Sequence, residues 1–395
     1  MTTVLSLGKT PLANRLLDES QLADSEPTWP LELVRCTACS LVQITETIPP
    51  ETLFRDYAYQ SSFSDTMVAH AKTLAQRLTN HRQLTSESLV VEIASNDGYL
   101  LQWYRGEGVP VLGIEPAENI AEIAIKERNI PTVSEFFGKE LAVKLVDQDR
   151  RADVIHANNV LAHVPDLNGV VAGIARLLKP CGVAVVECPY LKDMIEHVEF
   201  DTIYHEHLCY FSLTALNRLF RRHDLEITDV DRMPIHGGSL RIFATPHGAS
   251  PVAHAVQQML AEESSWVDSA AYYQGFFERV TDLRSRLLEL LSQVKAQNKR
   301  IAVYGASAKG STLLNCFGIG QESIEYVVDR STIKQGHYTP GTHLKICDPN
   351  RLVEDQPDYC LLLTWNFADE ILKQQQQYRA GGGKFIIPIP ELRVA

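Results

Sequence analysis

Four side chains that can carry a proton or orient a substrate stand together at Tyr204-His205-Glu206-His207. Imidazole titrates near neutral pH, and a phenol or a carboxyl group beside it can donate or accept a hydrogen bond, so the cluster suits general acid–base catalysis. Such density favours an enzyme over a binding module. Two alternatives are a satisfied polar turn and a metal site through His205 and His207, for which no third nearby ligand has matching spacing.

The elements upstream of this cluster predict a sheet that would position it. Residues 89–93 form an apolar run that leads into the turn Ala94-Ser95-Asn96-Asp97-Gly98. Short apolar runs then alternate with amphipathic helices, which predicts a parallel sheet with helices on both faces. The expected strands are 89–93, 110–115, 132–134, 153–157 and 182–187, with a closing pair at 226–230 and 239–244.

The turn at 94–98 indicates the cofactor, because ligands of open α/β sheets bind beyond the carboxyl ends of the strands. It lacks the G-x-G-x-x-G of dinucleotide binders and matches the looser pattern of S-adenosylmethionine (SAM) methyltransferases. We expect Glu115 on the ribose, Phe136 or Phe137 against the adenine, and Asn158 with Asn159 at the amino-acid end. The predicted SAM-binding residues are Glu92, Ser95, Asn96, Gly98, Glu115, Phe136, Asn158 and Asn159. The alternative is a surface Glu115 and a Gly98 that only starts a helix.

Composition narrows the partners. The chain has 395 residues, and 49 acidic against 37 basic residues give a net charge of -12, which disfavours nucleic acid and anionic lipid. The first residues lack a secretory pattern, and no apolar run approaches the roughly 20 residues needed to cross a bilayer. Eight scattered cysteines do not form a disulfide framework. A cytoplasmic protein that acts on a small molecule is expected.

A helical stretch at 252–297 leads into a second, smaller alternating unit with expected strands at 300–305, 324–329, 358–363 and 384–388. Its turn at 305–312 departs from a P-loop because Ser311 stands where lysine is required, and Ser307 breaks G-x-G-x-x-G. An ATP or NAD site is therefore not expected. A helix amino terminus with Lys309 beside it could still receive a diphosphate.

With these motifs in view, the chain resembles the SAM-dependent sugar C-methyltransferases of deoxysugar biosynthesis, which include 3-C-methyltransferases of nucleotide-linked 4-keto sugars. The resemblance covers nearly the whole length. It rests on E-x-x-S-N-D-G at 92–98, Y-H-E-H at 204–207, H-G-G-S-L-R at 236–241 and G-A-x-x-K-G-x-T-L-L-N at 305–315. It implies an α/β fold with a class I Rossmann-like core at 81–250, a small amino-terminal domain and lid at 1–80, and a smaller carboxy-terminal domain at 251–395 that binds the nucleotide sugar.

The implied chemistry assigns roles to the cluster. A 4-keto group acidifies the C-3 hydrogen, a base removes it, and the enolate attacks the sulfonium methyl. We expect His207 to be the base, Tyr204 the runner-up base or an enolate donor, Glu206 a substrate or orienting contact, and His163 a donor to the keto oxygen. The expected substrate-binding residues are Tyr59, with Tyr57 a lesser candidate, and His236, Arg241 and Lys309. The alternative is a relative that only binds a nucleotide sugar or methylates oxygen, without C-3 deprotonation.

The amino-terminal domain departs from the family pattern. The resemblance implies a zinc held by two C-x-x-C knuckles, whereas this sequence has Cys36 and Cys39 alone. Two thiolates cannot close a tetrahedral site. We therefore expect an incomplete zinc-type domain, from an upstream start or from folding without metal. A redox role for the pair has no thioredoxin-like context.

Overall fold

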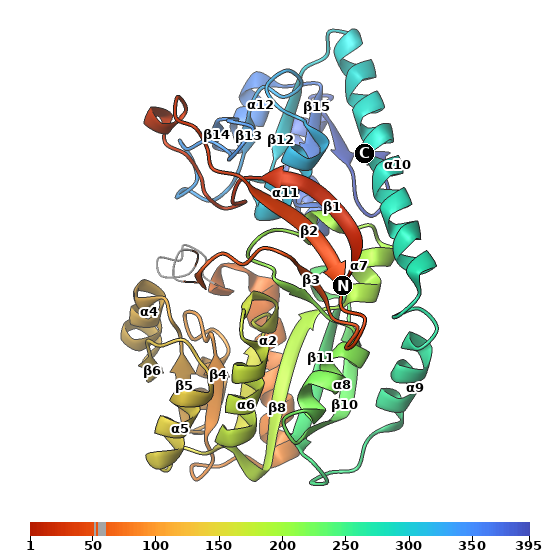
Figure 1. Cartoon of the computed structure of the whole chain (residues 1–395). Coiled ribbons are helices and arrows are strands. Elements are labelled where there is room, and N and C mark those ends of the chain that lie inside the picture. The colour runs from red at the N-terminus through yellow and green to blue at the C-terminus, as the bar shows by residue number, and fades with distance from the viewer. Residues whose placement is uncertain (51–52, 54–60) are drawn as a thin grey trace.

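Three β-sheets organise residues 1–50, 53 and 61–395, which are the residues that this computed structural model describes (Figure 1). The core sheet lies in the lower half of the view, and the carboxy-terminal sheet lies in the upper half. The strands β1 and β2 of the amino-terminal sheet lie between the halves, and one long helix, α10, connects them along one side.

The core sheet follows the alternating pattern of 89–246. Its seven strands have the order β10-β11-β8-β7-β4-β5-β6. They are β4 (Val90–Ile93), β5 (Val111–Ile114), β6 (Thr132–Val133), β7 (Ala152–Asn158), β8 (Leu178–Pro189), β10 (Leu225–Met233) and β11 (Ser239–Pro246). Strands β4 to β8 are parallel, and β10 and β11 are antiparallel. The prediction of a parallel sheet with a closing pair of strands is confirmed.

Helices flank this sheet. They are α2 (Asp65–Arg82), α3 (Leu101–Gly106), α4 (Glu118–Arg128), α5 (Lys139–Asp147), α6 (Leu167–Leu177), α7 (Leu191–Glu196) and α8 (Leu213–Arg221). Helix α2 begins where the Ser64 hydroxyl accepts the Met67 N–H at 3.3 Å, and it ends with His81 and Arg82, which suit the helix dipole. Its apolar face packs on the core beside α3, although a boundary at residue 80 was expected.

The amino-terminal sheet was not foreseen as a sheet. It is antiparallel and has the order β1-β2-β3-β9. Its strands are β1 (Thr2–Thr10), β2 (Trp29–Arg35), β3 (Val42–Ile44) and β9 (Cys209–Tyr210). Because β9 follows directly after Tyr204–His207, the predicted catalytic segment is anchored on this sheet as well as on the core. The described residues also form six short 3₁₀ turns: η1 (Glu19–Gln21), η2 (Ser61–Phe63), η3 (Leu161–His163), η4 (Phe200–Thr202), η5 (Ile235–Gly237) and η6 (Trp365–Phe367).

The carboxy-terminal part confirms the second α/β unit. Helices α9 (His254–Glu263) and α10 (Ala270–Ala296) lead to a sheet of order β14-β13-β12-β15-β16-β17. Its strands are β12 (Ile301–Tyr304), β13 (Val327–Val328), β14 (Ile346–Cys347), β15 (Tyr359–Leu362), β16 (Lys384–Ile387) and β17 (Arg393–Val394). Only β17 pairs antiparallel among these six. Its helices are α11 (Ala308–Phe317), α12 (Arg351–Asp355), α13 (Ala368–Gln374) and α14 (Gln376–Ala380).

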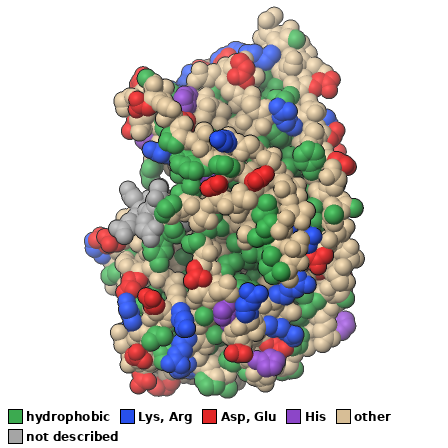
Figure 2. All heavy atoms as spheres, viewed as in Figure 1, with side chains coloured by type: hydrophobic (Ala, Val, Ile, Leu, Met, Phe, Trp, Pro, Cys, Tyr) green, Lys and Arg blue, Asp and Glu red, His purple; other side chains and the backbone are tan. Residues whose placement is uncertain are grey.

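The surface is apolar where the lower and upper halves of the molecule meet (Figure 2). On the face drawn in Figure 2, apolar side chains gather at the waist between the two halves, beside the residues drawn in grey. Within the described part of the chain, no helix has both the length and the apolar character that crossing a bilayer requires.

Candidate active site

The turn after β4 adopts the backbone shape that its small and amide residues predict. Ala94, Asn96 and Gly98 have positive φ angles of 51°, 49° and 78°. A Cβ at Gly98 would lie 2.9 Å from Cγ1 of Ile130. Glycine is therefore needed at this position both for its left-handed conformation and for packing.

Glu115, directly after β5, is tied to that turn. It is 5% exposed, its Oε2 accepts the N–H of Asn96 at 2.9 Å, and its Oε1 accepts the N–H of Ala117 at 2.9 Å. Burial raises the pKa of this carboxyl, and the two backbone donors oppose the shift. A surface Glu115 is thus excluded. Each oxygen keeps a second lone pair that can accept from a ribose hydroxyl.

Negative groups surround the same edge. Glu92 is buried, and its pKa is raised well above the ordinary value, first by burial and then by Asp97, Glu115 and Glu187. Asp97 is partly balanced by Arg128, whose NH2 lies 3.3 Å from Oδ2. The oxygens of these carboxyl groups can accept hydrogen bonds from a cofactor that carries an ammonium group.

The other predicted cofactor residues occupy the same edge with different orientations. Ser95 is fully buried, and its Oγ faces Gly113, where a Cβ would lie 2.5 Å away, so its side chain points into the sheet. The Asn96 side chain accepts the Ser61 N–H at 2.8 Å. Phe136 is 43% exposed, an open surface for a stacked base. Asn158 Oδ1 is buried with no hydrogen-bond partner in the described chain, and Asn159 has φ 57°.

The predicted catalytic segment, Tyr204–His207, joins this edge through two hydrogen bonds. The Leu208 N–H donates to the carbonyl oxygen of Ala162 at 2.7 Å, and His163 Nδ1 donates to the carbonyl oxygen of Glu206 at 2.7 Å. The acceptor Ala162 and the donor His163 both belong to η3, which begins three residues after the end of β7. The segment Tyr204–His207 therefore lies beside η3, which follows Asn158, the residue predicted to bind the methionine end of SAM.

His207 has the tautomer of a general base. A carbonyl oxygen can only accept, so the 2.8 Å contact between Nδ1 and the oxygen of Thr202 places the proton on Nδ1. Nε2 then carries the lone pair, and the Tyr204 hydroxyl lies 2.9 Å from it. The two rings are 4.1 Å apart between centroids. The structure thus pairs the first and second candidates for the base in one hydrogen bond.

His163 differs from its predicted role. Its Nδ1 proton is committed to the Glu206 carbonyl oxygen, and burial lowers the pKa of the imidazole to about 4. The ring is therefore neutral near pH 7, and its Nε2 is an acceptor. In this tautomer His163 cannot donate to a keto oxygen. Its ring centroid lies 4.8 Å from that of His207, so it packs against the base.

Glu206 receives contacts from both outer domains. It is 7% exposed, and its Oε1 accepts the Asn14 Nδ2 hydrogen at 2.7 Å. Burial raises the pKa of the carboxyl, while the Asn14 hydrogen bond and the charge of Lys334 lower it. Sequence reasoning missed Asn14, which is a single amide in a loop, and gave Lys334 no role.

His205 faces away from the other three side chains. Its Nε2 donates to the Pro30 carbonyl oxygen at 3.1 Å, its ring packs edge-on against Trp29, and burial lowers its pKa. His205 and His207 therefore contact different partners, which contradicts the alternative of a shared metal ion. His205 fastens the segment to the amino-terminal sheet.

The predicted substrate residues are placed as follows. Tyr59 and Tyr57 lie outside the described residues. His236 lies in η5, and the structure describes its backbone and not its side chain. Arg241 is 7% exposed, and its Nε donates to Glu187 at 2.6 Å, so its charge is already paired. Lys309 Nζ lies 4.4 Å from the ring centroid of Trp365.

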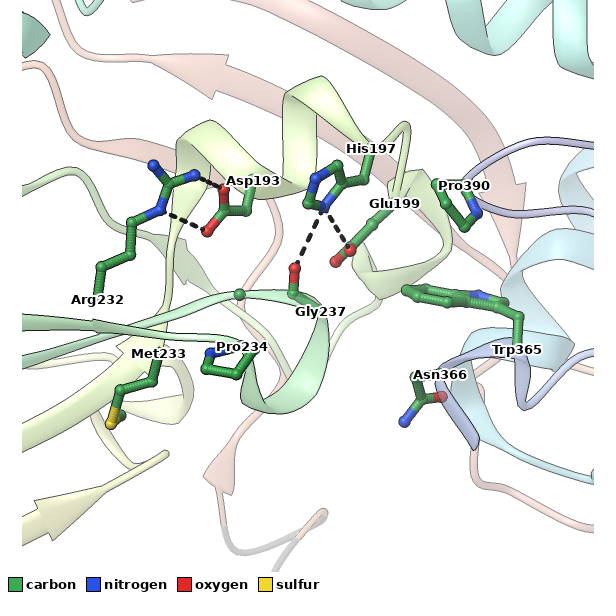
Figure 3. Close-up of a pocket in the computed structure, with 11 residues that line it drawn as sticks. Asp193, His197, Glu199, Arg232, Met233, Pro234, Gly237, Trp365, Asn366 and Pro390 are labelled. Carbon is green, nitrogen blue, oxygen red and sulfur yellow. Dashed lines mark hydrogen bonds and ion pairs between the residues drawn. The ribbon is translucent and has the colours of Figure 1, made fainter. Parts of the chain in front are cut away.

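Two cavities of about 610 and 770 Å³ lie between the core and the carboxy-terminal domain and share Trp365 and Asn366 in their walls. Figure 3 shows the smaller one. Gly237 and Gly238 of the H-G-G-S-L-R motif line the smaller one. A Cβ on either glycine would collide with a carboxylate, that of Glu199 or Asp193 respectively. The paired glycines thus let the two acids approach the backbone, which gives the motif a packing role.

Cys36 and Cys39 form a knuckle at the end of β2, where the Ser40 N–H donates to the Cys36 carbonyl oxygen at 3.0 Å. The backbone N–H groups of Cys39 and Ala38 lower the pKa of the Cys36 thiol, and burial raises that of Cys39. A closed structural zinc takes four ligands. Across residues 1–50, 53 and 61–395, no group of three or more His, Cys, Asp or Glu side chains could hold a metal. The described residues do not complete such a site.

Comparisons with known proteins cover the whole chain. Family models match at residues 1–54 ("putative zinc binding domain"), 67–230 ("methyltransferase domain") and 234–390 ("C-methyltransferase C-terminal domain"). The C-methyltransferase NovU of Streptomyces niveus is 38% identical over 393 residues, which are 99% of this chain and 93% of that protein.

Two further matches cover less. A ubiquinone biosynthesis O-methyltransferase of Rhodopseudomonas palustris (strain TIE-1) is 29% identical over 98 residues, 25% of this chain and 38% of that protein. The crystal structure of the PH0226 protein from Pyrococcus horikoshii OT3 is 16% identical, covers 50% of this chain and 96% of that chain, and has a TM-score of 0.39.

Proposed function

The chain belongs to the SAM-dependent C-methyltransferases, and from that premise we propose that it methylates C-3 of a nucleotide-diphosphate-linked 4-keto-deoxysugar. The cofactor is SAM. The remainder of the proposal concerns the substrate, the base and the residues that hold each ligand.

The SAM site is proposed at the carboxyl edge of β4, β5 and β7. Glu115 would accept from the ribose hydroxyls, since each of its oxygens has one lone pair free of the backbone donors. Asn158 would bind the amino-acid end, because its buried Oδ1 has no partner among the described residues. Ser95 would contribute only its backbone.

One observation carries the chemistry: the Nδ1 proton of His207 is committed to Thr202, and Nε2 faces the Tyr204 hydroxyl. Two routes use this pair. In the first, His207 Nε2 takes the C-3 proton directly, and Tyr204 steadies the enolate. In the second, the Tyr204 oxygen takes the C-3 proton as its own proton passes to Nε2. In both, the C–H electron pair becomes the enolate that attacks the methyl carbon of SAM, and the sulfonium leaves as a neutral thioether.

The sugar nucleotide is proposed to lie between Glu206 and the carboxy-terminal turn. Glu206 would accept from a sugar hydroxyl. The diphosphate would meet the amino terminus of α11, whose cap is the Ser307 side chain. Lys309 was the expected cation, but its ammonium packs on Trp365. Lys334 fits better, because its Nζ donates to the Ala306 carbonyl oxygen at 2.8 Å and its charge reaches Glu206.

The test is proton exchange at C-3 of a nucleotide-linked 4-keto sugar in deuterated buffer, followed by NMR, and then methyl transfer with SAM added. Exchange requires a base next to a carbonyl, so an O-methylating or merely binding relative would show none. Replacing His207 with alanine should slow exchange and transfer by about 10²–10⁴ and leave SAM affinity nearly unchanged. His247→Ala is the control, since that side chain is 69% exposed on the surface.

Tyr204→Phe separates the two routes. If the phenol only steadies the enolate, the loss should be smaller than in His207→Ala. If Tyr204 is the atom that takes the proton, the two losses should be alike. Wild-type exchange in His207→Ala would show that the base lies elsewhere.

A further inference from the structure

Asp201 is a buried carboxyl group that the proposed chemistry does not use. It lies in η4, three residues before Tyr204, and is 0% exposed. Its Oδ2 accepts the indole N–H of Trp365 at 2.7 Å, and its Oδ1 accepts no hydrogen bond from another described residue. Burying a carboxylate with a single hydrogen-bond donor costs folding free energy, which points to a role for this group beyond packing.

Two residues of the carboxy-terminal domain contact η4. Trp365 begins η6, directly beyond β15, and holds Asp201. Phe200 stacks on Phe317 of α11, with centroids 4.7 Å apart and rings inclined by 18°. In Figure 3, Trp365 projects from that domain toward the segment that carries Glu199, just before η4. Helix α11 and η6 follow the neighbouring strands β12 and β15, at the edge where ligands of open sheets bind.

Thr202, the third residue of η4, forms a hydrogen bond with the proposed base His207. The Thr202 carbonyl oxygen accepts the Nδ1 hydrogen of His207 at 2.8 Å, and this contact selects the tautomer that leaves a lone pair on Nε2. The Thr202 side chain is held in turn, because its hydroxyl donates to the Glu199 carbonyl oxygen at 2.8 Å. The position of η4 therefore decides the orientation of the imidazole.

We propose that Asp201 and Trp365 are positioning residues through which the carboxy-terminal domain holds η4 and thereby sets the tautomer and orientation of His207. The inference rests on the proposed role of His207 as the base. It adds that the domain expected to bind the nucleotide also prepares the base. Neither residue contacts the sugar or the cofactor in this scheme; both act through Thr202.

The charges around Asp201 are consistent with this role. Burial raises the pKa of the carboxyl to about 7, the charge of Lys309 and the Trp365 N–H lower it, and Glu199 raises it. Lys309, which packs on the Trp365 ring, thus supports both members of the contact. Removing the indole donor should loosen η4 while leaving the aromatic packing in place.

The experiment compares Trp365→Phe with Trp266→Phe. Trp266 is 6% exposed, close to the 7% of Trp365, and its indole N–H has no acceptor among the described residues. Trp365→Phe should lower C-3 exchange and kcat by about 10–100-fold, the scale of a small misplacement of a catalytic group. KM for the sugar nucleotide and the SAM affinity should stay within about twofold, since no ligand contact is lost. Trp266→Phe should exchange at the wild-type rate.

Asp201→Asn gives a second arm, because its amide oxygen can still accept from the indole. It should keep most of the activity, whereas Asp201→Ala should match Trp365→Phe. NMR of ¹⁵N-histidine-labelled protein, with the His207 signals assigned from His207→Ala, should show Nδ1 protonated in the wild type and in Asp201→Asn. In Trp365→Phe the two tautomers should mix.

Two results would overturn the inference: wild-type exchange in Trp365→Phe, or an unchanged His207 tautomer in Trp365→Phe and Asp201→Ala. Failure of the proposed function looks different. The wild type would then show no C-3 exchange at all, while the NMR arm would still report whether Trp365 sets the tautomer.

Discussion

The molecule contains two glycine-bearing turns that have the same construction and opposite electrostatic surroundings. One follows β4 in the core, and the other follows β12 in the carboxy-terminal domain. In each, an acid at the end of the neighbouring strand accepts a backbone N–H from the turn. Glu115 accepts from Asn96 and also from Ala117, two residues on. Asp329 accepts from Ala306 and also from Ser331, two residues on.

The charges around the turns differ. The core turn is surrounded by Glu92, Asp97, Glu115 and Glu187, and Arg128 is paired with Asp97. Beside the carboxy-terminal turn stand Lys309 and Lys334, with a ten-residue helix whose amino terminus faces the same edge. The backbone frame is thus shared, and the side chains around it differ. In the proposed function, the carboxyl groups at the core turn face a cationic cofactor, and the lysines at the carboxy-terminal turn face an anionic group.

Asp201 is fully buried and lacks the two backbone donors that Glu115 and Asp329 have, and this contrast predicts the largest effect. Burial raises the pKa of Asp201 to about 7, against about 3.9 in an unfolded chain. The folded state therefore keeps this proton to higher pH than the unfolded state does. The stabilisation is complete below pH ~4 and is lost as the pH rises to about 7, by up to about 4 kcal/mol.

Urea unfolding at a series of pH values, for the wild type and for Asp201→Asn, measures this contribution. The difference between the two free-energy curves should fall from pH 4 to 7 and be flat above. Parallel curves would mean that burial does not raise the pKa of Asp201.

Gly98 of the core turn and Gly108, which follows α3, provide the next comparison. Gly98 has φ 78° and a Cβ there would lie 2.9 Å from Ile130, whereas Gly108 has the same φ with nothing within 4 Å. Gly108→Ala should cost about 1–2 kcal/mol of unfolding free energy from the left-handed backbone alone. Gly98→Ala should cost about 1–3 kcal/mol more, from the added overpacking. Equal losses in thermal unfolding would show that Ile130 moves aside without cost.

The sequence predicts the frame of both turns better than it predicts their partners. Parallel strands and helices were found because their apolar periodicity is local, and the Tyr204–His207 cluster because it is dense. The contacts that orient the cluster are remote in sequence: Asn14 lies 192 residues from Glu206, and Trp365 lies 164 from Asp201. No pattern in one chain marks such pairs.

Side-chain roles were harder to predict than side-chain positions. The expected donor role of His163 reverses because a backbone carbonyl takes its Nδ1 proton. Arg241 and Lys309 were expected to bind the substrate, and the structure pairs Arg241 with Glu187 and places the Lys309 ammonium over the Trp365 ring. The strand β9 escaped notice because it has only two residues, and its partner β3 lies far away in the chain. A tautomer or a paired charge depends on the fold and cannot be read from residue type.

A direct test of the core turn removes its acid. Glu115→Ala should weaken SAM binding by about 1–3 kcal/mol, because ribose hydroxyls and two backbone donors lose a buried acceptor. Isothermal titration measures the change. Asp329→Ala, the matched change at the other turn, should leave SAM affinity as it is. An unaltered SAM affinity in Glu115→Ala would remove the ribose assignment, and with it the parallel between the two acids.

The smallest expected effect concerns the anionic side of the comparison. If the carboxy-terminal turn receives a diphosphate, Lys334→Ala should weaken the binding of thymidine or uridine diphosphate by about tenfold at low salt. The site loses one partly exposed ammonium group and keeps the amino terminus of α11. The difference should shrink as salt screens the pair, since the Debye length falls to about 3 Å at 1 M. Lys384→Ala is the control, because Lys384 begins β16 at the opposite edge of the same sheet. Titration of both variants with each diphosphate and with SAM separates the two turns. Loss of SAM affinity in Lys334→Ala, or equal diphosphate affinity in the two lysine variants at low salt, would end the assignment of opposite charges to the two turns.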